Sequence, residues 1–125
     1  MYAARYNQNT DVLTTLLAAG ADIKAQDTYY GATALIWAAR FNRPEVITTL
    51  LKAGADFEAR ANDGSTALIT AVEFNENSEV FMTLLKAGED AKAKDKAGKT
   101  AFDYAQSNEK LKGTTAYQRL QQASQ

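Results

Sequence analysis

Hydrophobic residues recur along the chain in clusters whose spacing is typical of helices. Val46, Ile47, Leu50 and Leu51 form one cluster, and their spacing places all four side chains on one face of a helix. The same cluster occurs 34 residues earlier and 34 residues later. The pattern therefore predicts amphipathic helices at a regular interval, the other two carrying Val12, Leu13, Leu16 and Leu17, and Val80, Phe81, Leu84 and Leu85.

A second helix is predicted directly before each of these clusters. Thr33 is suited to the N-cap position, where its hydroxyl accepts a free backbone N–H, and residues 34–41 follow it as a largely apolar segment. Pro44 suits the first turn of the next helix, because a missing N–H costs nothing there. Gly54 suits its end, where a left-handed residue is common. Each unit thus reads as two short helices followed by a loop or hairpin.

Two phrases repeat three times each and define the period. The first is LLAAGAD at 16–22, LLKAGAD at 50–56 and LLKAGED at 84–90, and the second is Gly-x-Thr-Ala. Their unequal spacings indicate a period of 33 with two single-residue insertions, one near residues 28–30 and one near 75–77. Both insertions fall in predicted loops, where extra residues are tolerated best.

These phrases resemble ankyrin repeats, chiefly through GATAL at 31–35, WAA at 37–39 and LLKAGAD at 50–56. The residues of these phrases are also similar to those of bacterial ankyrin sequences. The resemblance implies an all-α repeat solenoid of about three and a half to four helix–turn–helix units joined by hairpin loops. One departure is that Ile36 and Ile69 replace the family's usual histidine, so apolar contact is expected to replace its hydrogen bonds.

We expect residues 1–125 to form a single ankyrin-repeat domain. The four predicted units are a truncated N-terminal repeat at 1–26, complete repeats at 27–60 and 61–94, and a C-terminal capping repeat at 95–125. The first unit lacks its Thr-Ala-Leu opening, which suggests a truncated, engineered or unusual native start at Met1. The last unit is polar in its second helix, where Gly113 interrupts the expected run, and a terminal repeat needs such a face toward water.

Composition excludes several classes of function. Fourteen basic residues against fifteen acidic ones give a net charge of −1, without the basic excess of a nucleic-acid binder. No apolar run reaches the length of about 20 residues that spans a bilayer. We therefore predict neither nucleic-acid nor membrane binding. Localisation stays open between a cytoplasmic and, if a signal peptide was removed, a periplasmic or secreted protein.

The chain has no histidine and no cysteine, which removes most nucleophile–base pairs and soft-metal sites. Carboxylates remain at Asp27, Asp63, Asp90 and Asp95. Asp63 before Gly64 is better explained as a turn residue than as a calcium ligand, because alanines occupy the positions where further oxygen ligands would stand. We therefore predict no enzyme activity, no cofactor and no metal.

The resemblance implies that a partner docks on the concave face, which hairpin tips and first helices build. Tyr29 and Tyr30 lie in the lengthened loop, where exposure is expected. Trp37 and Phe41 lie four residues apart on one helix face, and Phe74 occupies the equivalent place in the next unit. The predicted partner-binding residues are Tyr29, Tyr30, Trp37, Arg40, Phe41, Asn62, Asp63, Glu73 and Phe74.

Alternatives remain for some of these residues. The row of Tyr6, Phe41 and Phe74 could belong to the core or to the binding surface, and packing is favoured, since aromatic residues at helical spacing are more often core. For Trp37 burial and solvent contact are equally open. Arg40 and Glu73 could form an inter-repeat surface pair of little energetic value.

The sequence thus favours a non-catalytic module that binds a partner protein of unknown identity. One alternative is a truncated or engineered scaffold without a dedicated partner. Another is a self-associating array, because an opened first unit exposes apolar surface. We expect a monomer, with weak self-association left open.

Overall fold

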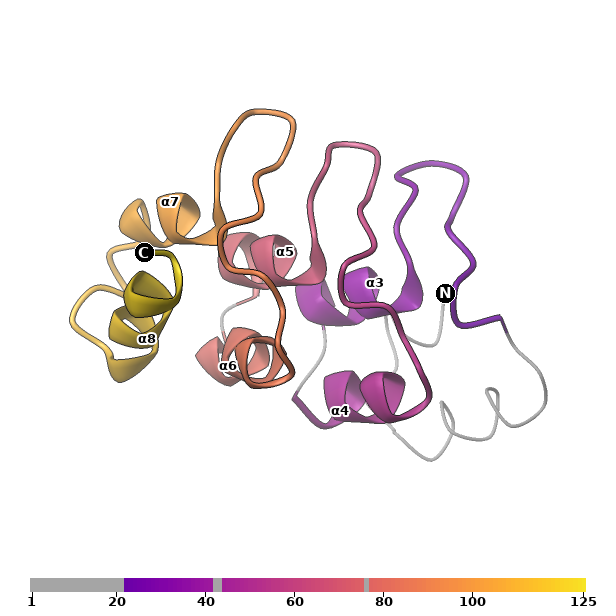
Figure 1. The fold of residues 1–125 in the computed structure, drawn as a ribbon, viewed down its shortest axis with the longest axis horizontal. Helices are drawn as coiled ribbons and strands as arrows, with labels where there is room; N and C mark the ends of the chain where they lie inside the picture. The colour runs from indigo at the N-terminus through magenta and orange to yellow at the C-terminus, as the bar shows by residue number, and fades with distance from the viewer. Residues whose placement is uncertain (1–21, 42–43, 76) are drawn as a thin grey trace.

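The computed structural model of the chain describes residues 22–41, 44–75 and 77–125. Within these ranges the chain forms helices and turns and no strand, so the predicted all-α solenoid is confirmed. The helices come in pairs, as the repeat pattern predicts (Figure 1). The pairs are α3 (Ala34–Phe41) with α4 (Pro44–Lys52), α5 (Ala67–Phe74) with α6 (Ser78–Lys86), and α7 (Ala101–Gln106) with α8 (Thr115–Ala123).

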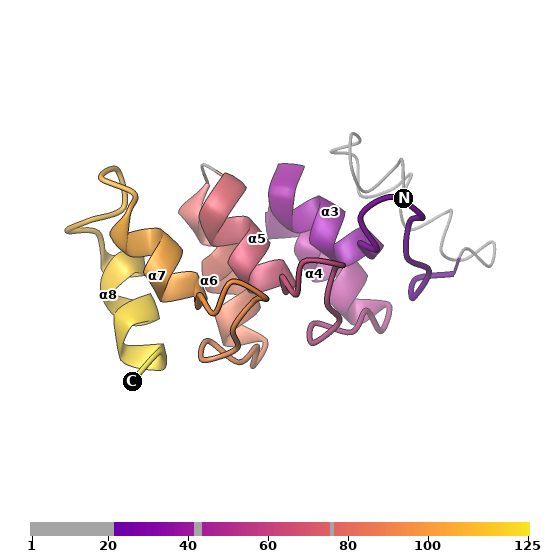
Figure 2. The ribbon, with the colours of Figure 1, turned by 90° about the horizontal axis from the view of Figure 1, so that it is seen from above.

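The pairs stack side by side into two layers of helices. The first helices α3, α5 and α7 form one layer and pack against each other in that order, while α4, α6 and α8 form the second (Figure 1). Seen from above, the units follow one another in a row (Figure 2). The segments that join one unit to the next project as long loops from the layer of first helices. We call these loops hairpins.

A threonine precedes each first helix that the structure describes, namely α3, α5 and α7. Its Oγ1 accepts a backbone N–H three residues on, which satisfies one of the free donors of the first turn. In the last unit Asp103 returns a hydrogen bond to the Thr100 N–H, completing a capping box. The three contacts are Ile36 N to Thr33 at 3.4 Å, Ile69 N to Thr66 at 3.3 Å and Asp103 N to Thr100 at 3.2 Å.

α4 begins at the predicted proline, and α4 and α6 end just before the predicted glycines. Pro44 is the first residue of α4. Gly54 and Gly88 follow α4 and α6 with φ of 97° and 102°, in the left-handed region that favours glycine. Gly20, predicted to do the same, lies outside the described residues.

The core runs through the stack rather than through one unit. Leu35 and Leu68 are fully buried, and the small side chains of Ala38, Ala39 and Ala71 are fully buried between first helices. Ile36 and Ile69, the residues that replace histidine, are 5% and 1% exposed and belong to this apolar core.

Hydrogen bonds tie neighbouring hairpins together. The Asn62 N–H donates to the Tyr30 carbonyl at 2.8 Å, and the Lys96 N–H donates to the Asp63 carbonyl at 3.0 Å. The Arg60 guanidinium bridges two hairpins by donating to the Lys94 carbonyl at 2.7 Å and to its own hairpin at 3.0 Å. The hairpins are therefore fixed relative to each other, which makes the surface between them rigid.

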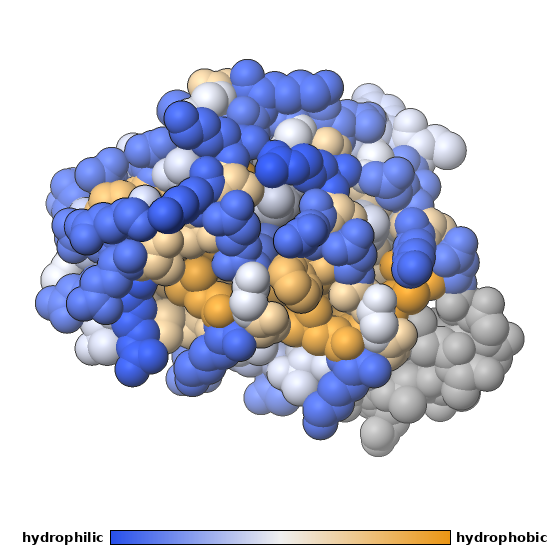
Figure 3. All heavy atoms as spheres, in the orientation of Figure 1, coloured by the Kyte–Doolittle hydropathy of each residue, from blue (hydrophilic) through white to orange (hydrophobic). Residues whose placement is uncertain are grey.

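The last helix closes the stack. Leu120 of α8 is buried, while the glutamines and arginine beside it face solvent, as a terminal repeat requires. Gly113 lies in the turn before α8 and not inside a helix. On the face shown in Figure 3, hydrophilic side chains cover the hairpins and hydrophobic ones form a band at the level of the helices. None of the described helices is long and apolar enough to cross a membrane.

Candidate functional site

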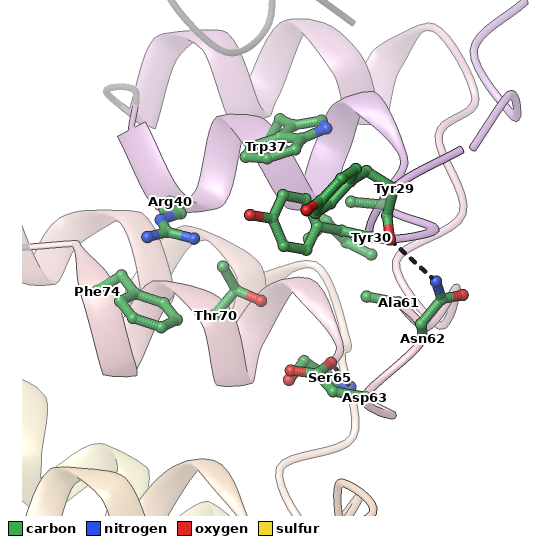
Figure 4. Close-up of a pocket in the computed structure, with 12 residues that line it drawn as sticks. Tyr29, Tyr30, Trp37, Arg40, Ala61, Asn62, Asp63, Ser65, Thr70 and Phe74 are labelled. Carbon is green, nitrogen blue, oxygen red and sulfur yellow. Dashed lines mark hydrogen bonds between the residues drawn. The ribbon is translucent and has the colours of Figure 1, made fainter. Parts of the chain in front are cut away.

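A small apolar cavity opens between the second and third units. Its volume is about 160 Å³, close to that of a cavity that accepts one benzene ring. Two hairpins and the first helices α3 and α5 form its walls (Figure 4). The lining residues are Tyr29, Tyr30, Ala32, Ile36, Trp37, Arg40, Ala61, Asn62, Asp63, Ser65, Thr70 and Phe74.

An aspartate in the hairpin holds an aromatic residue of the first helix on either side of this cavity. In the second unit Asp27 Oδ2 accepts the indole N–H of Trp37 at 2.6 Å. In the fourth unit Asp95 Oδ2 accepts a short hydrogen bond from the Tyr104 hydroxyl. We call this arrangement the hairpin clamp. It places a large side chain against the hairpin and leaves little space there.

The third unit lacks the clamp. Ala61 makes the same two backbone hydrogen bonds as Asp27 and Asp95, so it occupies the equivalent hairpin position, but its side chain is a methyl group. Thr70 stands where the neighbours carry Trp37 and Tyr104. Both small residues line the cavity. The cavity therefore exists because the third unit carries small side chains where its neighbours carry an aspartate and an aromatic ring.

Asp27 also organises the hairpin above the cavity. Its Oδ1 accepts the N–H groups of Tyr29, Tyr30 and Gly31 at 3.0, 2.6 and 3.2 Å. Burial by itself would raise the pKa of Asp27, but these hydrogen bonds and that of Trp37 outweigh it, so the pKa lies below its ordinary value. The carboxylate is thus charged at neutral pH and fixes both the loop and the indole.

The aromatic side chains form a continuous group along one edge of the cavity. The Tyr29 and Tyr30 rings meet edge to face at 4.9 Å, and Tyr30 meets Trp37 in the same way at 5.6 Å. Trp37 stacks on Phe41 at 5.9 Å and 15°. Such pairs are favourable geometries for aromatic rings. The group is preorganised, because each ring is supported by the next.

Seven of the nine predicted partner-binding residues line this cavity: Tyr29, Tyr30, Trp37, Arg40, Asn62, Asp63 and Phe74. Glu73 and Phe41 do not line it, although Phe41 contacts Trp37. Tyr29 and Tyr30 are 81% and 50% exposed. The structure thus brings most of the predicted residues together, while their role in binding stays a prediction.

Exposure resolves two of the open alternatives. Trp37 is only 6% exposed, because its ring lies under Tyr30 and its indole N–H is held by Asp27. Phe41 and Phe74 are 39% and 49% exposed, so the favoured assignment of this row to the core is wrong for them. They lie at the ends of the first helices, where the neighbouring unit leaves part of each ring uncovered. Tyr6, the third member of the row, lies outside the described residues.

Arg40 does not pair with Glu73 as the sequence suggested. Within the described part of the chain the one ion pair joins Lys112 and Glu109. The Arg40 guanidinium carbon instead lies 4.2 Å from the centre of the Phe74 ring and 5.1 Å from that of Phe41. Two aromatic faces therefore hold this cation in place.

Glu73 of α5 is influenced by two other carboxylates. Its pKa is raised, first by burial and then by the nearby carboxylates of Asp63 and Asp95, whereas Arg40 and Lys99 oppose the shift less strongly. The electrostatic environment of Glu73 is therefore dominated by carboxylates rather than by Arg40. Asp63 stabilises the backbone turn in which it lies, because its Oδ1 accepts the Ser65 N–H at 3.0 Å.

Neither the hairpin clamp nor its loss in the third unit was predicted from the sequence. A signal was present, because Asp27 and Asp95 align with Ala61 while Trp37 and Tyr104 align with Thr70. The two positions change together along the repeats. Reading them as a pair would have predicted a hollow at the third unit.

A second, more polar cavity of about 240 Å³ lies between the last two hairpins and holds a buried carboxyl group. Glu89 is 6% exposed, and its Oε1 accepts the Leu68 N–H at 2.9 Å at the start of α5. Its Oε2 is buried without a hydrogen-bond partner in the described part of the chain. Burial raises the pKa of Glu89 to about 7. The other two complete phrases carry alanine at this position, Ala21 and Ala55.

Within the described ranges no three carboxylate, histidine or cysteine side chains gather closely enough to hold a metal ion. The lining of the first cavity combines aromatic rings with hydroxyl groups, the Arg40 guanidinium, the Asn62 amide and the single carboxylate of Asp63. This lining suits the binding of a side chain or small organic group.

Comparison with known proteins agrees with the repeat pattern. A family model described as ankyrin repeats (three copies) matches residues 1–95. A search of curated protein sequences found no significant match.

Proposed function

Since this chain belongs to the ankyrin-repeat family, we propose that it binds a partner protein, using the cavity between its second and third units as the anchor point. Ankyrin repeats are generally protein-interaction modules and are typically non-catalytic. We propose the same non-catalytic role here. The observation that carries the proposal is the missing clamp of the third unit, which leaves an open apolar cavity beside exposed tyrosines.

The chemistry of the cavity supports this role. Its lining combines aromatic rings with a few polar groups, and buried aromatic and arginine residues carry most of the energy at protein interfaces. A large apolar side chain of a partner would fill the cavity and contact the exposed face of Tyr30. Burying apolar surface is favourable by about 25 cal/mol per Å².

Rigidity supports it as well. The hairpins above the cavity are joined by the bond from the Asn62 N–H to the Tyr30 carbonyl, and Asp27 fixes the loop that carries both tyrosines. A surface that is ordered before binding loses little conformational entropy when the partner docks.

A test needs a ligand, which a random-peptide display library can supply. Peptides selected on the wild-type protein would be titrated against three variants, with binding followed by fluorescence of Trp37, the single tryptophan of the chain. Tyr29→Ala/Tyr30→Ala removes the exposed rings. Ala61→Asp/Thr70→Tyr fills the cavity by copying Asp95 and Tyr104. Gln118→Ala/Gln122→Ala alters only the exposed side of α8 and serves as the control.

We expect the first two variants to bind selected peptides at least about tenfold more weakly, a loss of about 1.4 kcal/mol. The α8 variant should bind as the wild type does. Trp37→Ala, which the sequence alone would recommend, is a poor test, because that side chain is buried and its loss would disturb the fold. Unchanged affinity in a folded, filled-cavity variant would disprove the proposal.

A further inference from the structure

The guanidinium of Arg40 lies at one end of the cavity. In the described part of the chain it forms no ion pair, and its Nε is buried without a hydrogen-bond acceptor. The side chain is half-buried and lies over the Phe74 ring. An arginine held in this way has lost its side-chain entropy in advance, which lowers the cost of binding an anion.

Arg40 supplies a positive charge that the next two units lack. Their equivalent residues are Glu73 and Ser107, whereas the first unit carries Arg5 at this position, outside the described residues. Figure 4 shows Arg40 and Phe74 at one end of the cavity and Asn62 and Asp63 at the other. The hydroxyl of Tyr30 points along the cavity toward the Arg40 end. A group bound at that end would meet a guanidinium and a hydroxyl donor.

The carboxylates near the cavity do not satisfy Arg40. Asp27 is occupied by the indole of Trp37 and by three backbone N–H groups. Asp63 lies at the far end and accepts the Ser65 N–H. Glu73 forms no ion pair with Arg40 in the described part of the chain, and its pKa is raised by burial and by Asp63 and Asp95 more than the charge of Arg40 lowers it. The cation at this end is therefore available to a ligand.

We propose that Arg40 binds a carboxylate of the partner, namely that of an aspartate or glutamate next to the large apolar residue that enters the cavity. This inference rests on the proposed function and adds the chemistry of the partner. The planar guanidinium offers two parallel N–H donors to a carboxylate, a geometry that neutral or basic residues cannot match. Partners would therefore be segments that combine an acidic and a large apolar residue.

Three small compounds isolate the charge from the apolar contact. They are 3-phenylpropionate, 3-phenylpropionamide and 3-phenylpropylamine, which share the phenyl group and carry a negative, neutral or positive end. Each would be titrated into the ¹⁵N-labelled full chain at low ionic strength, because screening weakens such contacts. Chemical shifts of Tyr30, Thr70 and the Trp37 indole N–H would report on the cavity.

The variants are Arg40→Gln, which removes the charge, and Arg40→Lys, which keeps the charge but not the planar fork. Lys99→Gln is the matched control, since Lys99 also places a cation over an aromatic ring, 5.4 Å from the centre of Tyr104, but lies outside the cavity. Circular dichroism and urea unfolding would establish that each variant is folded before its affinity is compared.

We expect the carboxylate to bind the wild type about fivefold more tightly than the amide, and the amine to bind most weakly. In Arg40→Gln the affinities for the carboxylate and the amide should differ by no more than about twofold. The ratio of these affinities in Arg40→Lys should lie between that of Arg40→Gln and that of the wild type, and in Lys99→Gln it should equal that of the wild type. Equal binding of the carboxylate and the amide, or tighter binding of the amine, would overturn the inference while leaving the cavity as an apolar anchor.

If no compound shifts the cavity resonances, the cavity accepts no such group, and the proposed function fails together with the inference. A display selection on Arg40→Glu gives an independent readout. Peptides selected on this variant should be enriched in lysine and arginine where those selected on the wild type carry aspartate and glutamate. The same acidic enrichment on both proteins would contradict the role of Arg40.

Discussion

The carboxylate of Asp27 accepts the indole N–H of Trp37 at 2.6 Å across the base of the hairpin of the second unit. Ten residues separate the two in sequence, and the contact joins a loop to the middle of a helix. The same carboxylate orders the loop that carries Tyr29 and Tyr30. One side chain thus couples the position of the buried ring to that of the exposed rings.

Replacing Asp27 with asparagine should loosen this coupling. The amide oxygen can still accept the loop N–H groups, but the amide nitrogen would face the indole N–H, so two donors would meet without an acceptor. We expect a loss of about 1–3 kcal/mol in the free energy of unfolding. Trp37 fluorescence should shift to longer wavelength as its ring gains solvent.

Asp63→Asn is the control for that experiment, because Asp63 Oδ1 accepts only the Ser65 N–H and touches no indole. Urea unfolding followed by circular dichroism and by fluorescence would measure both variants. An unchanged emission maximum and unchanged stability in Asp27→Asn would show that the indole hydrogen bond contributes nothing.

Rebuilding the clamp in the third unit tests why the cavity exists. Ala61→Asp and Thr70→Tyr together should reproduce the contact of Asp95 with Tyr104, whereas each alone leaves a polar group without its partner. We expect the double variant to be more stable than the sum of the single changes by about 1 kcal/mol or more. Urea titrations of all four proteins measure this coupling, and additive effects would mean that the clamp does not form at this position.

The helices and their arrangement could be predicted from the sequence because they depend on local signals. Thr33, Pro44 and Gly54 each mark a helix boundary through their own backbone or hydroxyl chemistry, and the structure places all three at such boundaries. Each repeat carries the same helix-boundary signals, so the boundaries predicted in one unit can be checked against those of the next.

The cavity could not be predicted in the same way, because it depends on pairs of residues that meet only in the stack. Within its own helix Thr70 gives no sign of a cavity. The cavity becomes apparent only when Thr70 is considered together with Ala61 of the hairpin and compared with Trp37 of the preceding unit. Periodicity likewise assigned Phe41 and Phe74 to the core, since it cannot show that the neighbouring unit leaves part of each ring uncovered. The contact of Arg40 with the Phe41 and Phe74 rings, rather than with Glu73, also depends on how neighbouring units stack, which the sequence does not show.

Because two hairpins approach closely at Gly64, we expect substitution by alanine to destabilise the protein more at Gly64 than at Gly98. Both have a left-handed φ, of 83° and 81°, so alanine costs about 1–2 kcal/mol of backbone strain at either position. A Cβ at Gly64 would also lie 2.8 Å from the Lys96 backbone nitrogen, whereas a Cβ at Gly98 meets nothing within 4 Å.

Gly64→Ala should therefore destabilise the protein more than Gly98→Ala does. The crowded nitrogen is the one that donates to the Asp63 carbonyl, so the substitution should also weaken the bond between hairpins. Thermal unfolding of the two variants measures the difference. Equal losses would indicate that the hairpins can separate without cost.

Burial of Glu89 predicts an unusual dependence of stability on pH. Its pKa of about 7 in the folded protein exceeds the ordinary value of 4.5, so the folded state binds a proton more tightly than the unfolded state does. The contribution of this group is therefore fully present below pH 4.5 and is lost as pH rises toward and through 7. A shift of this size corresponds to about 3 kcal/mol.

Glu89→Gln should remove most of this dependence, because the amide stays neutral while its oxygen can still accept the Leu68 N–H. Of the charged groups around the same cavity, Glu58 raises the pKa further and Arg60 lowers it, while Asp90 also lines the cavity. Arg60→Gln should therefore raise the pKa of Glu89 and strengthen the effect, which makes it a control of opposite sign. Urea unfolding at intervals from pH 4.5 to 8 measures all three proteins. If wild type and Glu89→Gln lose stability in parallel over this range, Glu89 does not titrate as its burial requires.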